Sequence, residues 1–169
     1  AWPKANYAEL AAKLVTILEV DVEIVGGKED FTLCDEIAVA SGSKRVKTLD
    51  GQFDIHRLFD LLKRRSLLIA NCNGVSHIAA AIGLPVVGLY GPTAAVHTGP
   101  FSQYLTAISR DLECSPCYRR GYTQGCGNPV CMSGIPVDVV YYAARSVLLR
   151  KMAASAQRAE QLALKYDLT

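Results

Sequence analysis

The segment from Ile69 to Thr93, "IANCNGVSHIAAAIGLPVVGLYGPT", places polar side chains where an apolar strand gives way to an alanine-rich helix. The first N–H groups of such a helix have no partner within it and lie at the positive end of its dipole. Gly74 lets an anion approach these groups closely, Asn73 can cap the helix, and His77 lies one turn further on. The pattern suits a phosphate. A capped helix with a purely structural histidine explains it equally well.

Two further strand ends carry glycines and polar residues. The stretch "VGGKED" places Glu29 and Asp30 after a short apolar run, where a carboxylate can hold a ribose hydroxyl. The stretch "LYGPT" places Gly91 and Thr93 at the end of another apolar run. If these strands are neighbours, the three strand ends form a nucleotide pocket on one edge of a sheet.

The elements that would position these residues alternate along the chain. Apolar periodicity predicts helices over residues 6–19, 28–41, 54–65 and 74–83 and from about 136 onwards. Apolar runs predict strands within residues 21–27, 45–51, 66–71, 85–91 and 104–109. Alternation of this kind is typical of an α/β fold, with a Rossmann-like parallel sheet and helices on both faces. We expect residues 1–169 to form a single domain, whose ligands bind beyond the carboxyl ends of the strands.

Four of the six cysteines fall in an irregular loop over residues 111–136, rich in glycine and proline. They are Cys114, Cys117, Cys126 and Cys131. One interpretation is a tetrahedral zinc site, for which the first pair has the right spacing. The other is that the cysteines are free or disulfide-linked. Arg119 and Arg120 follow the first pair and could meet an anion, although such arginines more often lie in a solvated turn.

Composition excludes several classes of protein. The 18 Lys and Arg residues nearly balance the 16 Asp and Glu residues, and no basic run is interleaved with aromatic residues. We therefore expect no binding to nucleic acid. No apolar stretch is long enough to span a bilayer, and the first residues lack the pattern of a signal peptide, which predicts a cytoplasmic protein. The chain lacks an initiator Met, so we expect it to be part of a longer protein.

Taken together, the motifs "ANCNGVSHIAAAIGLPVVGLYGPT", "TGPF", "CSPCYRR" and a later "CM" are recognisable. They resemble the C-terminal domain of glycosyltransferase family 9, the family of ADP-heptose lipopolysaccharide heptosyltransferases. The resemblance covers nearly the whole chain: it begins with "WP" at Trp2-Pro3 and includes "GG" at Gly26-Gly27. It implies the GT-B architecture, in which two Rossmann-like domains face a cleft and the C-terminal domain holds most of the donor.

The resemblance also implies an activity. The protein would transfer heptose or a related sugar from a nucleotide-diphosphate donor, ADP-heptose, to a lipopolysaccharide-type glycolipid, without a required cofactor. It would work in the cytoplasm at the inner face of the bacterial inner membrane, with peripheral membrane association. The acceptor site and the catalytic base would lie in an N-terminal domain outside these residues. We therefore expect no catalytic residue here, and no transfer by this chain alone.

The resemblance assigns roles to particular positions. Gly74 and His77 would face the donor diphosphate, with Thr93 close by. Glu29 or Asp30 would lie near the ribose. The turn around residues 49–53 would lie against the base.

One position departs from the family pattern. Where the family has an Asp that contacts the donor sugar, this chain has Cys72, between Asn71 and Asn73. A thiol cannot replace the two acceptor oxygens of a carboxylate. An alternative function is therefore a nucleotide-binding module that has lost transferase activity. A zinc-ribbon-like interaction domain is a third alternative, and it depends on the clustered cysteines alone.

Overall fold

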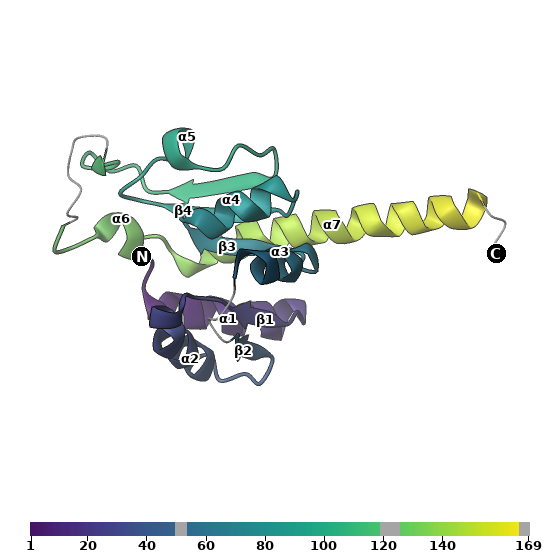
Figure 1. Ribbon diagram of the computed structural model, residues 1–169, viewed down its shortest axis with the longest axis horizontal. Coiled ribbons are helices and arrows are strands. Elements are labelled where there is room, and N and C mark those ends of the chain that lie inside the picture. The colour runs from purple at the N-terminus through teal and green to yellow at the C-terminus, as the bar shows by residue number, and fades with distance from the viewer. Residues whose placement is uncertain (50–53, 119–125, 166–169) are drawn as a thin grey trace.

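The computed structural model describes residues 1–49, 54–118 and 126–165. Helices and strands alternate along most of the chain (Figure 1). The elements are α1 (Lys4–Leu18), β1 (Val22–Ile24), the short 3-10 helix η1 (Lys28–Asp30), α2 (Phe31–Ala40), β2 (Val46–Thr48), α3 (Ile55–Lys63), β3 (Leu68–Asn71), α4 (Gly74–Ala81), β4 (Val86–Tyr90), α5 (Ala95–Thr98), β5 (Leu105–Ser109), α6 (Val130–Ser133) and α7 (Val137–Lys165).

The strands pair in parallel, as the alternation predicted. β3, β4 and β5 form a three-stranded sheet in that order, and β1 pairs with β2 in a separate two-stranded sheet. All five residues of the central strand β4 are buried. A strand covered on both faces needs such a continuous apolar run, because both rows of its side chains leave water.

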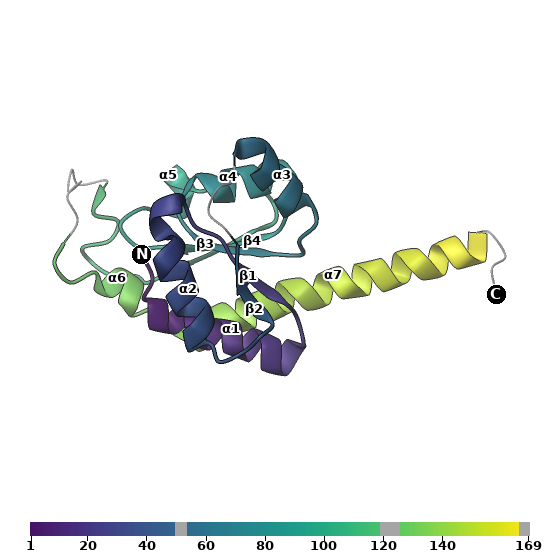
Figure 2. The same cartoon turned by 60° about the horizontal axis from the view of Figure 1, so that its bottom comes forward.

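Helices cover both faces of the three-stranded sheet, which confirms the predicted fold class. Val87 and Leu89 of β4 pack on one face against α1, α6 and α7. Val86 packs on the opposite face in a cluster with Leu62 of α3 and Ala79 of α4. Figure 2 shows the sheet between α3 and α4 on one side and α1 and α7 on the other.

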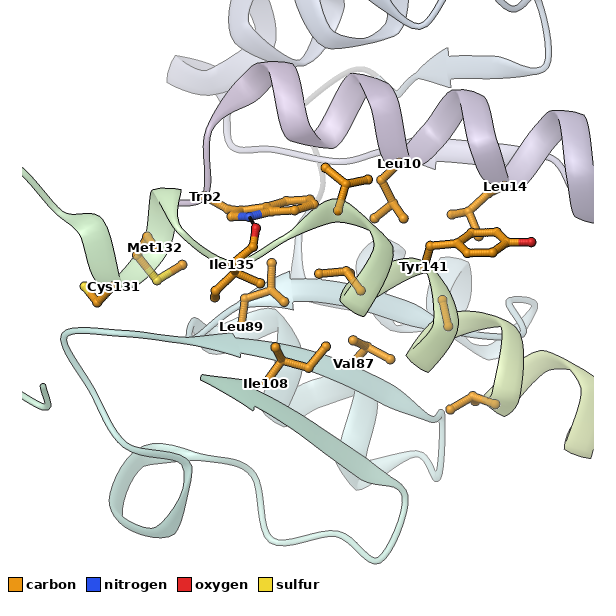
Figure 3. Close-up of a cluster of buried hydrophobic side chains, with 14 residues drawn as sticks. Trp2, Leu10, Leu14, Val87, Leu89, Ile108, Cys131, Met132, Ile135 and Tyr141 are labelled. Atoms are coloured by element: carbon orange, nitrogen blue, oxygen red, sulfur yellow. Dashed lines mark hydrogen bonds between the residues drawn. The ribbon is translucent and has the colours of Figure 1, made fainter. Parts of the chain in front are cut away.

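Trp2 fastens the start of the chain to two distant segments. Its side chain is 3% exposed, and its indole Nε1 donates a hydrogen bond of 3.0 Å to the carbonyl oxygen of Ile135, just before α7 (Figure 3). Its backbone N–H donates a bond of 3.2 Å to Oδ1 of Asn71, at the end of β3. The ring also meets Tyr7 edge-on, with centroids 4.8 Å apart. These contacts fix α1 relative to the edge of the sheet where β3 ends.

The prediction of an irregular segment over residues 111–136 is wrong at α6. This helix has four residues, two of which, Cys131 and Met132, are buried. Helices this short are not stable alone, so packing against the end of β4 must support it, and periodicity in the sequence cannot detect such support. The short helix α5 was also not predicted, for the same reason.

The predicted C-terminal helix is confirmed as α7, and over residues 137–158, whose side chains are described, its buried residues lie between Val137 and Val147. Beyond them the helix projects away from the rest of the chain (Figure 1). Among the described residues, none of the helices combines the length and the apolar character needed to cross a bilayer.

Candidate functional site

The ends of β3 and β4 lie side by side, so two of the three strand ends singled out in the sequence are neighbours. The third, after β1, belongs to the separate two-stranded sheet, so the prediction of all three on one edge of a single sheet is wrong. Asn71, the last residue of β3, stands opposite Leu89 of β4. The backbone N–H of Cys72 then donates a bond of 3.3 Å to the carbonyl oxygen of Leu89. Parallel pairing brings the turn before α4 and the Gly-Pro-Thr turn after β4 to the same edge of the sheet, where α/β folds bind ligands.

The N-terminus of α4 is capped as the sequence predicted. Asn73 has extended backbone geometry, and its Oδ1 accepts a bond of 3.3 Å from the backbone N–H of Ser76. The hydroxyl of Ser76, which is 1% exposed, donates a bond of 2.6 Å back to the carbonyl oxygen of Asn73. This reciprocal pair orders the turn and leaves the first N–H groups of the helix directed past its end.

Gly74 and His77 are both accessible at this helix end. A Cβ on Gly74 would meet no heavy atom within 4 Å, so the space beside its backbone is open. His77 is exposed, which settles that its side chain faces outwards and not into the sheet. An anion at this end could therefore contact the backbone at Gly74 and the imidazole of His77 together.

Cys72 contacts α5, an element that the sequence did not reveal. Its Sγ lies 3.3 Å from the Oγ1 of Thr98 and 3.6 Å from the carbonyl oxygen of the same residue. The hydroxyl of Thr98 also donates a bond of 3.1 Å to the carbonyl oxygen of Ala94. The position at which the resemblance led us to expect a carboxylate thus contacts the last residue of α5.

Gly91 has a packing role that the sequence did not suggest. It is buried, and a Cβ there would lie 2.6 Å from Sδ of Met132 and 2.8 Å from Sγ of Cys131. Only glycine lets α6 approach this closely. Its predicted contact with a donor is untested and stays a prediction.

Glu29 and Asp30 lie in η1, at the carboxyl end of β1, and both are exposed. Gly26, just before η1, has the same packing role as Gly91, because a Cβ there would lie 2.7 Å from Sγ of Cys34 and 2.8 Å from Cβ of Asp30. An ion pair between Glu23 of β1 and Arg65, just before β3, ties the two sheets together.

Three of the predicted contacts fall partly or wholly outside the described residues. Of the turn predicted to lie against the base, Leu49 is described, and its backbone N–H donates a bond of 3.0 Å to the carbonyl oxygen of Ile24. The rest of that turn, residues 50–53, lies outside the described residues, as do Arg119 and Arg120.

The zinc site, one of the two interpretations of the clustered cysteines, is not formed among the described residues. Over residues 1–49, 54–118 and 126–165, no group of three or more His, Cys, Asp or Glu side chains converges to hold a metal ion. All six cysteines are free, which also excludes a disulfide in this structure. Cys131 is buried under Gly91 while Cys114 and Cys126 are exposed. Burial, and then the nearby thiol of Cys117, raise the pKa of the Cys131 thiol.

A cavity of about 230 Å³ adjoins Thr93 at the same edge of the sheet. Its lining residues come from the turn after β4, from α5 and from the segment that follows Cys114: Thr93, Ala94, His97, Thr98, Pro116 and Tyr118. Five of these were not predicted as site residues (Ala94, His97, Thr98, Pro116 and Tyr118), and no motif in the sequence joined them. The only sequence feature that could have linked these residues was that "GPT" and "CSPCY" both belong to the motifs of the family resemblance.

Tyr90 of β4 is a further buried residue that the sequence analysis did not single out. Its side chain is 1% exposed, and its hydroxyl has no hydrogen-bond partner among the described residues. Burial raises the pKa of Tyr90, and the thiol of Cys72 adds to the effect. The ring folds back over β4, since a Cβ on Gly88 would lie 2.7 Å from its Cε2. Glycine at position 88 therefore makes room for the ring.

The comparison with known families decides the assignment. The sequence model of glycosyltransferase family 9, described as heptosyltransferase, matches residues 1–126, which is about three quarters of the chain. The chain belongs to glycosyltransferase family 9. The family resemblance drawn from the sequence is thereby confirmed.

Characterised relatives of this family 9 chain are similar over part of their length. It is 33% identical over 110 residues to the lipooligosaccharide heptosyltransferase 2 of Haemophilus influenzae, covering 63% of this chain and 32% of the relative. It is 32% identical over 110 residues to the lipopolysaccharide heptosyltransferase 2 of Salmonella typhimurium, covering 63% and 31%. The chain thus spans about a third of the length of these relatives.

Solved structures of family 9 proteins share the fold. The E. coli ADP-heptose lipopolysaccharide heptosyltransferase II superimposes with a TM-score of 0.74 at 26% identity, over 89% of this chain and 43% of that one. A family 9 glycosyltransferase of Veillonella parvula gives a TM-score of 0.72 at 26% identity, over 88% and 42%. These matches confirm the α/β fold expected of one half of a GT-B glycosyltransferase.

Proposed function

We propose that this chain is the donor-binding part of a family 9 glycosyltransferase. The whole protein would transfer heptose, or a related sugar, from ADP-heptose to a lipopolysaccharide-type acceptor. The observation that carries the proposal is the capped N-terminus of α4 at the carboxyl edge of the parallel sheet, with open space at Gly74 and an exposed His77. The names of the relatives and of the similar solved structures support the choice of donor and acceptor.

This site suits the leaving group of a glycosyl transfer, the nucleoside diphosphate. The acceptor hydroxyl attacks the anomeric carbon, the bond from that carbon to the diphosphate oxygen breaks, and the proton of the hydroxyl passes to a base. The diphosphate leaves with one more negative charge than it had as an ester. Backbone N–H groups at Gly74 and the side chain of His77 would stabilise that charge. The base would lie in a part of the protein outside this chain.

The nucleoside would extend from α4 towards the other strand ends. Glu29 and Asp30 are exposed at the end of β1, where a carboxylate can accept hydrogen bonds from the ribose hydroxyls. Thr93 would lie on the phosphate side, because the turn that carries it adjoins α4. We place the whole protein in the cytoplasm, in peripheral contact with the inner membrane where a glycolipid acceptor would be presented.

A second candidate function is favoured by Cys72. Its thiol contacts Thr98 and offers a sugar only a weak hydrogen bond, in place of the carboxylate expected there. The chain would then hold a nucleotide without positioning a sugar for transfer. Comparing the affinity of the chain for the nucleotide with its affinity for the nucleotide-sugar separates the two functions, because only a sugar-positioning site would prefer the nucleotide-sugar.

The test is a calorimetric titration of the 169-residue chain with ADP-heptose, ADP, AMP, UDP and GDP. We expect ADP to bind more tightly than AMP, because the second phosphate would reach the end of α4. We also expect ADP to bind more tightly than UDP or GDP. Equal affinities for ADP and AMP would contradict the proposed diphosphate site at α4. A preference for UDP or GDP would support the diphosphate site at α4, but it would indicate a donor with a base other than adenine.

A further inference from the structure

Three successive side chains at the end of β3 contact three different parts of the chain. Asn71 bonds the segment that leads into α1, Cys72 contacts α5, and Asn73 caps α4. Asn71 stands opposite Leu89 of β4, whose side chain lies in the buried cluster that α1 and α7 cover. Because successive side chains of a strand point to opposite faces of a sheet, Asn71 and Cys72 hold the turn before α4 from opposite sides.

The side-chain amide of Asn71 bonds two residues near the start of the chain. Its Oδ1 accepts a bond of 3.2 Å from the backbone N–H of Trp2. Burial raises the pKa of Tyr7 to about 12, and a hydrogen bond with the Asn71 side chain opposes that rise. A hydrogen bond that lowers the pKa of a phenol is one that its oxygen accepts, so the amide nitrogen of Asn71 is the donor. Both ends of the amide are thus engaged on the α1 side.

The two partners of this amide are fixed by the core. The indole of Trp2 is buried and bonded to the carbonyl oxygen of Ile135, and its ring meets that of Tyr7 at an interplanar angle of 85° (Figure 3). Trp2 belongs to the same buried cluster as Leu10 and Leu14 of α1, and Tyr7 packs against that cluster. The amide is therefore held by well-packed residues and can act as a rigid anchor for the end of β3.

The backbone alone holds the turn before α4 weakly. The last bond between β3 and β4, from the backbone N–H of Cys72 to the carbonyl oxygen of Leu89, is 3.3 Å long. Such bonds usually measure about 2.7–3.2 Å. The chain then leaves the sheet, and the first N–H groups of α4 have no partner within the helix. Side-chain contacts of the turn must therefore set the direction in which these groups point.

We propose that Asn71 is a positioning residue for the diphosphate site at the end of α4. It acts without touching the ligand, by orienting the turn before α4 through its bonds to Trp2 and Tyr7. The inference rests on the proposed function and extends it, because it makes the affinity for the second phosphate depend on a contact with the α1 segment. That contact lies on the face of the sheet opposite to Cys72.

The test measures the ratio of ADP affinity to AMP affinity for Asn71→Ala by calorimetry, and the urea midpoint of the same variant. We expect the ratio to fall about 5-fold, because only the second phosphate would reach the end of α4. A purely structural role would lower the midpoint and leave the ratio unchanged. Val147→Ala is the matched control. Val147 is buried on α7, about 15 Å along the helix from Val137, so its truncation should lower the midpoint and keep the ratio.

Tyr7→Phe examines one of the two bonds by itself. It removes the hydroxyl that Asn71 bonds and keeps the ring against Trp2, so the ratio should fall less than in Asn71→Ala, by about 2-fold. Added to Asn71→Ala, it should change the ratio no further, because the bond that it removes is already absent. Should Asn71→Ala fail to fold, Tyr7→Phe carries the test, and an unchanged ratio in that variant overturns the proposal.

Two other results would overturn the positioning role of Asn71. One is an unchanged ratio in a folded Asn71→Ala variant, and the other is an equal fall in Val147→Ala. If the unaltered chain binds ADP no more tightly than AMP, the proposed function fails instead, and the positioning role is tested by amide hydrogen exchange. The backbone N–H of Ser76, which Asn73 caps, should then exchange faster in Asn71→Ala than in Val147→Ala. Equal exchange rates would overturn the proposal.

Discussion

The thiol of Cys72 lies 3.3 Å from the hydroxyl oxygen of Thr98, and this contact joins the turn before α4 to the short helix α5. It brings the residue that departs from the expected family pattern next to a residue that lines the cavity beside α5. The same thiol lies 3.6 Å from the carbonyl oxygen of Thr98. A carboxylate at position 72 would be repelled by that oxygen.

Cys72→Asp should raise the preference for ADP-heptose over ADP. A carboxylate can accept bonds from neighbouring sugar hydroxyls, and each such bond contributes about 0.5–1.5 kcal/mol, or roughly 2- to 12-fold in affinity. Calorimetric titration of both ligands gives the ratio directly. Cys72→Ser, which adds a hydroxyl without a charge, is the control and should change the ratio less. An unchanged ratio with Asp would favour the nucleotide-binding module without transferase activity.

His77→Ala should weaken ADP binding and leave the fold intact. A hydrogen bond to a charged group contributes about 1.5–3 kcal/mol, which corresponds to roughly a 10- to 150-fold loss of affinity. His77 is exposed, so its removal leaves no internal space. His56→Ala is the matched control, since His56 is also exposed but lies on α3. Equal ADP affinity in the two variants would leave His77 without a role in binding.

Substitution of two glycines by alanine, at positions 74 and 91, should distinguish a glycine needed for ligand binding from one needed for packing. Gly74→Ala has free space around the new Cβ and should preserve stability, while lowering ADP affinity by blocking the approach to the backbone. Gly91→Ala places its Cβ 2.6 Å from Sδ of Met132 and should cost about 1–3 kcal/mol of unfolding free energy. Urea unfolding and ADP titration of both variants measure these effects. Loss of stability in Gly74→Ala would contradict the open geometry of the helix end.

The stability of the chain should fall in alkaline solution partly through Tyr7. Burial raises the pKa of Tyr7 from 10.0 to about 12, against a smaller opposite effect of its hydrogen bond with Asn71. Between these two values the unfolded state loses the proton and the folded state keeps it, so the free energy of unfolding decreases as pH rises. Below pH 10 this contribution is constant. Across the window the loss would reach at most about 2.7 kcal/mol.

Urea unfolding of the unaltered chain and of Tyr7→Phe at pH 8, 9, 10 and 11 measures this contribution. The stability difference between the two should shrink above pH 10, since phenylalanine has no proton to lose. Tyr104→Phe, at a position that is 51% exposed, serves as the control and should show no such change. A difference that stays constant from pH 8 to 11 would contradict the raised pKa of Tyr7.

The elements with strong local patterns were predictable from the sequence. The five strands, their parallel arrangement, the cap at Asn73 and the long C-terminal helix all follow from periodicity and residue type, and the structure has each of them. The short helices α5 and α6 were missed. Four residues carry too little periodicity, and their stability comes from distant residues, as the packing of Cys131 and Met132 against Gly91 illustrates.

The clustered cysteines show why spacing alone is insufficient for a site. Their intervals in the sequence allowed a zinc site, yet Cys131 is buried in α6 while Cys114 and Cys126 are exposed. Among the described residues these side chains do not form a group that could hold a metal ion. The sequence contains the ligand types, and the packing of α6 decides that they do not form a metal site.

By itself the sequence determined the fold class, the family and the helix end to which the diphosphate is assigned, because each depends on residues close together in the chain. Only the tertiary structure decided what surrounds that helix end. The contact of Cys72 with Thr98 spans 26 positions, and the bond from Ser115 to Gly91 spans 24. These contacts exist because parallel pairing of β3 with β4 brings their carboxyl ends to one edge, and because hydrogen bonds to the turn after β4 fasten the segment after Cys114 there. No local pattern specifies which distant side chains meet at such an edge, so the cavity beside α5 could be found only in the folded chain.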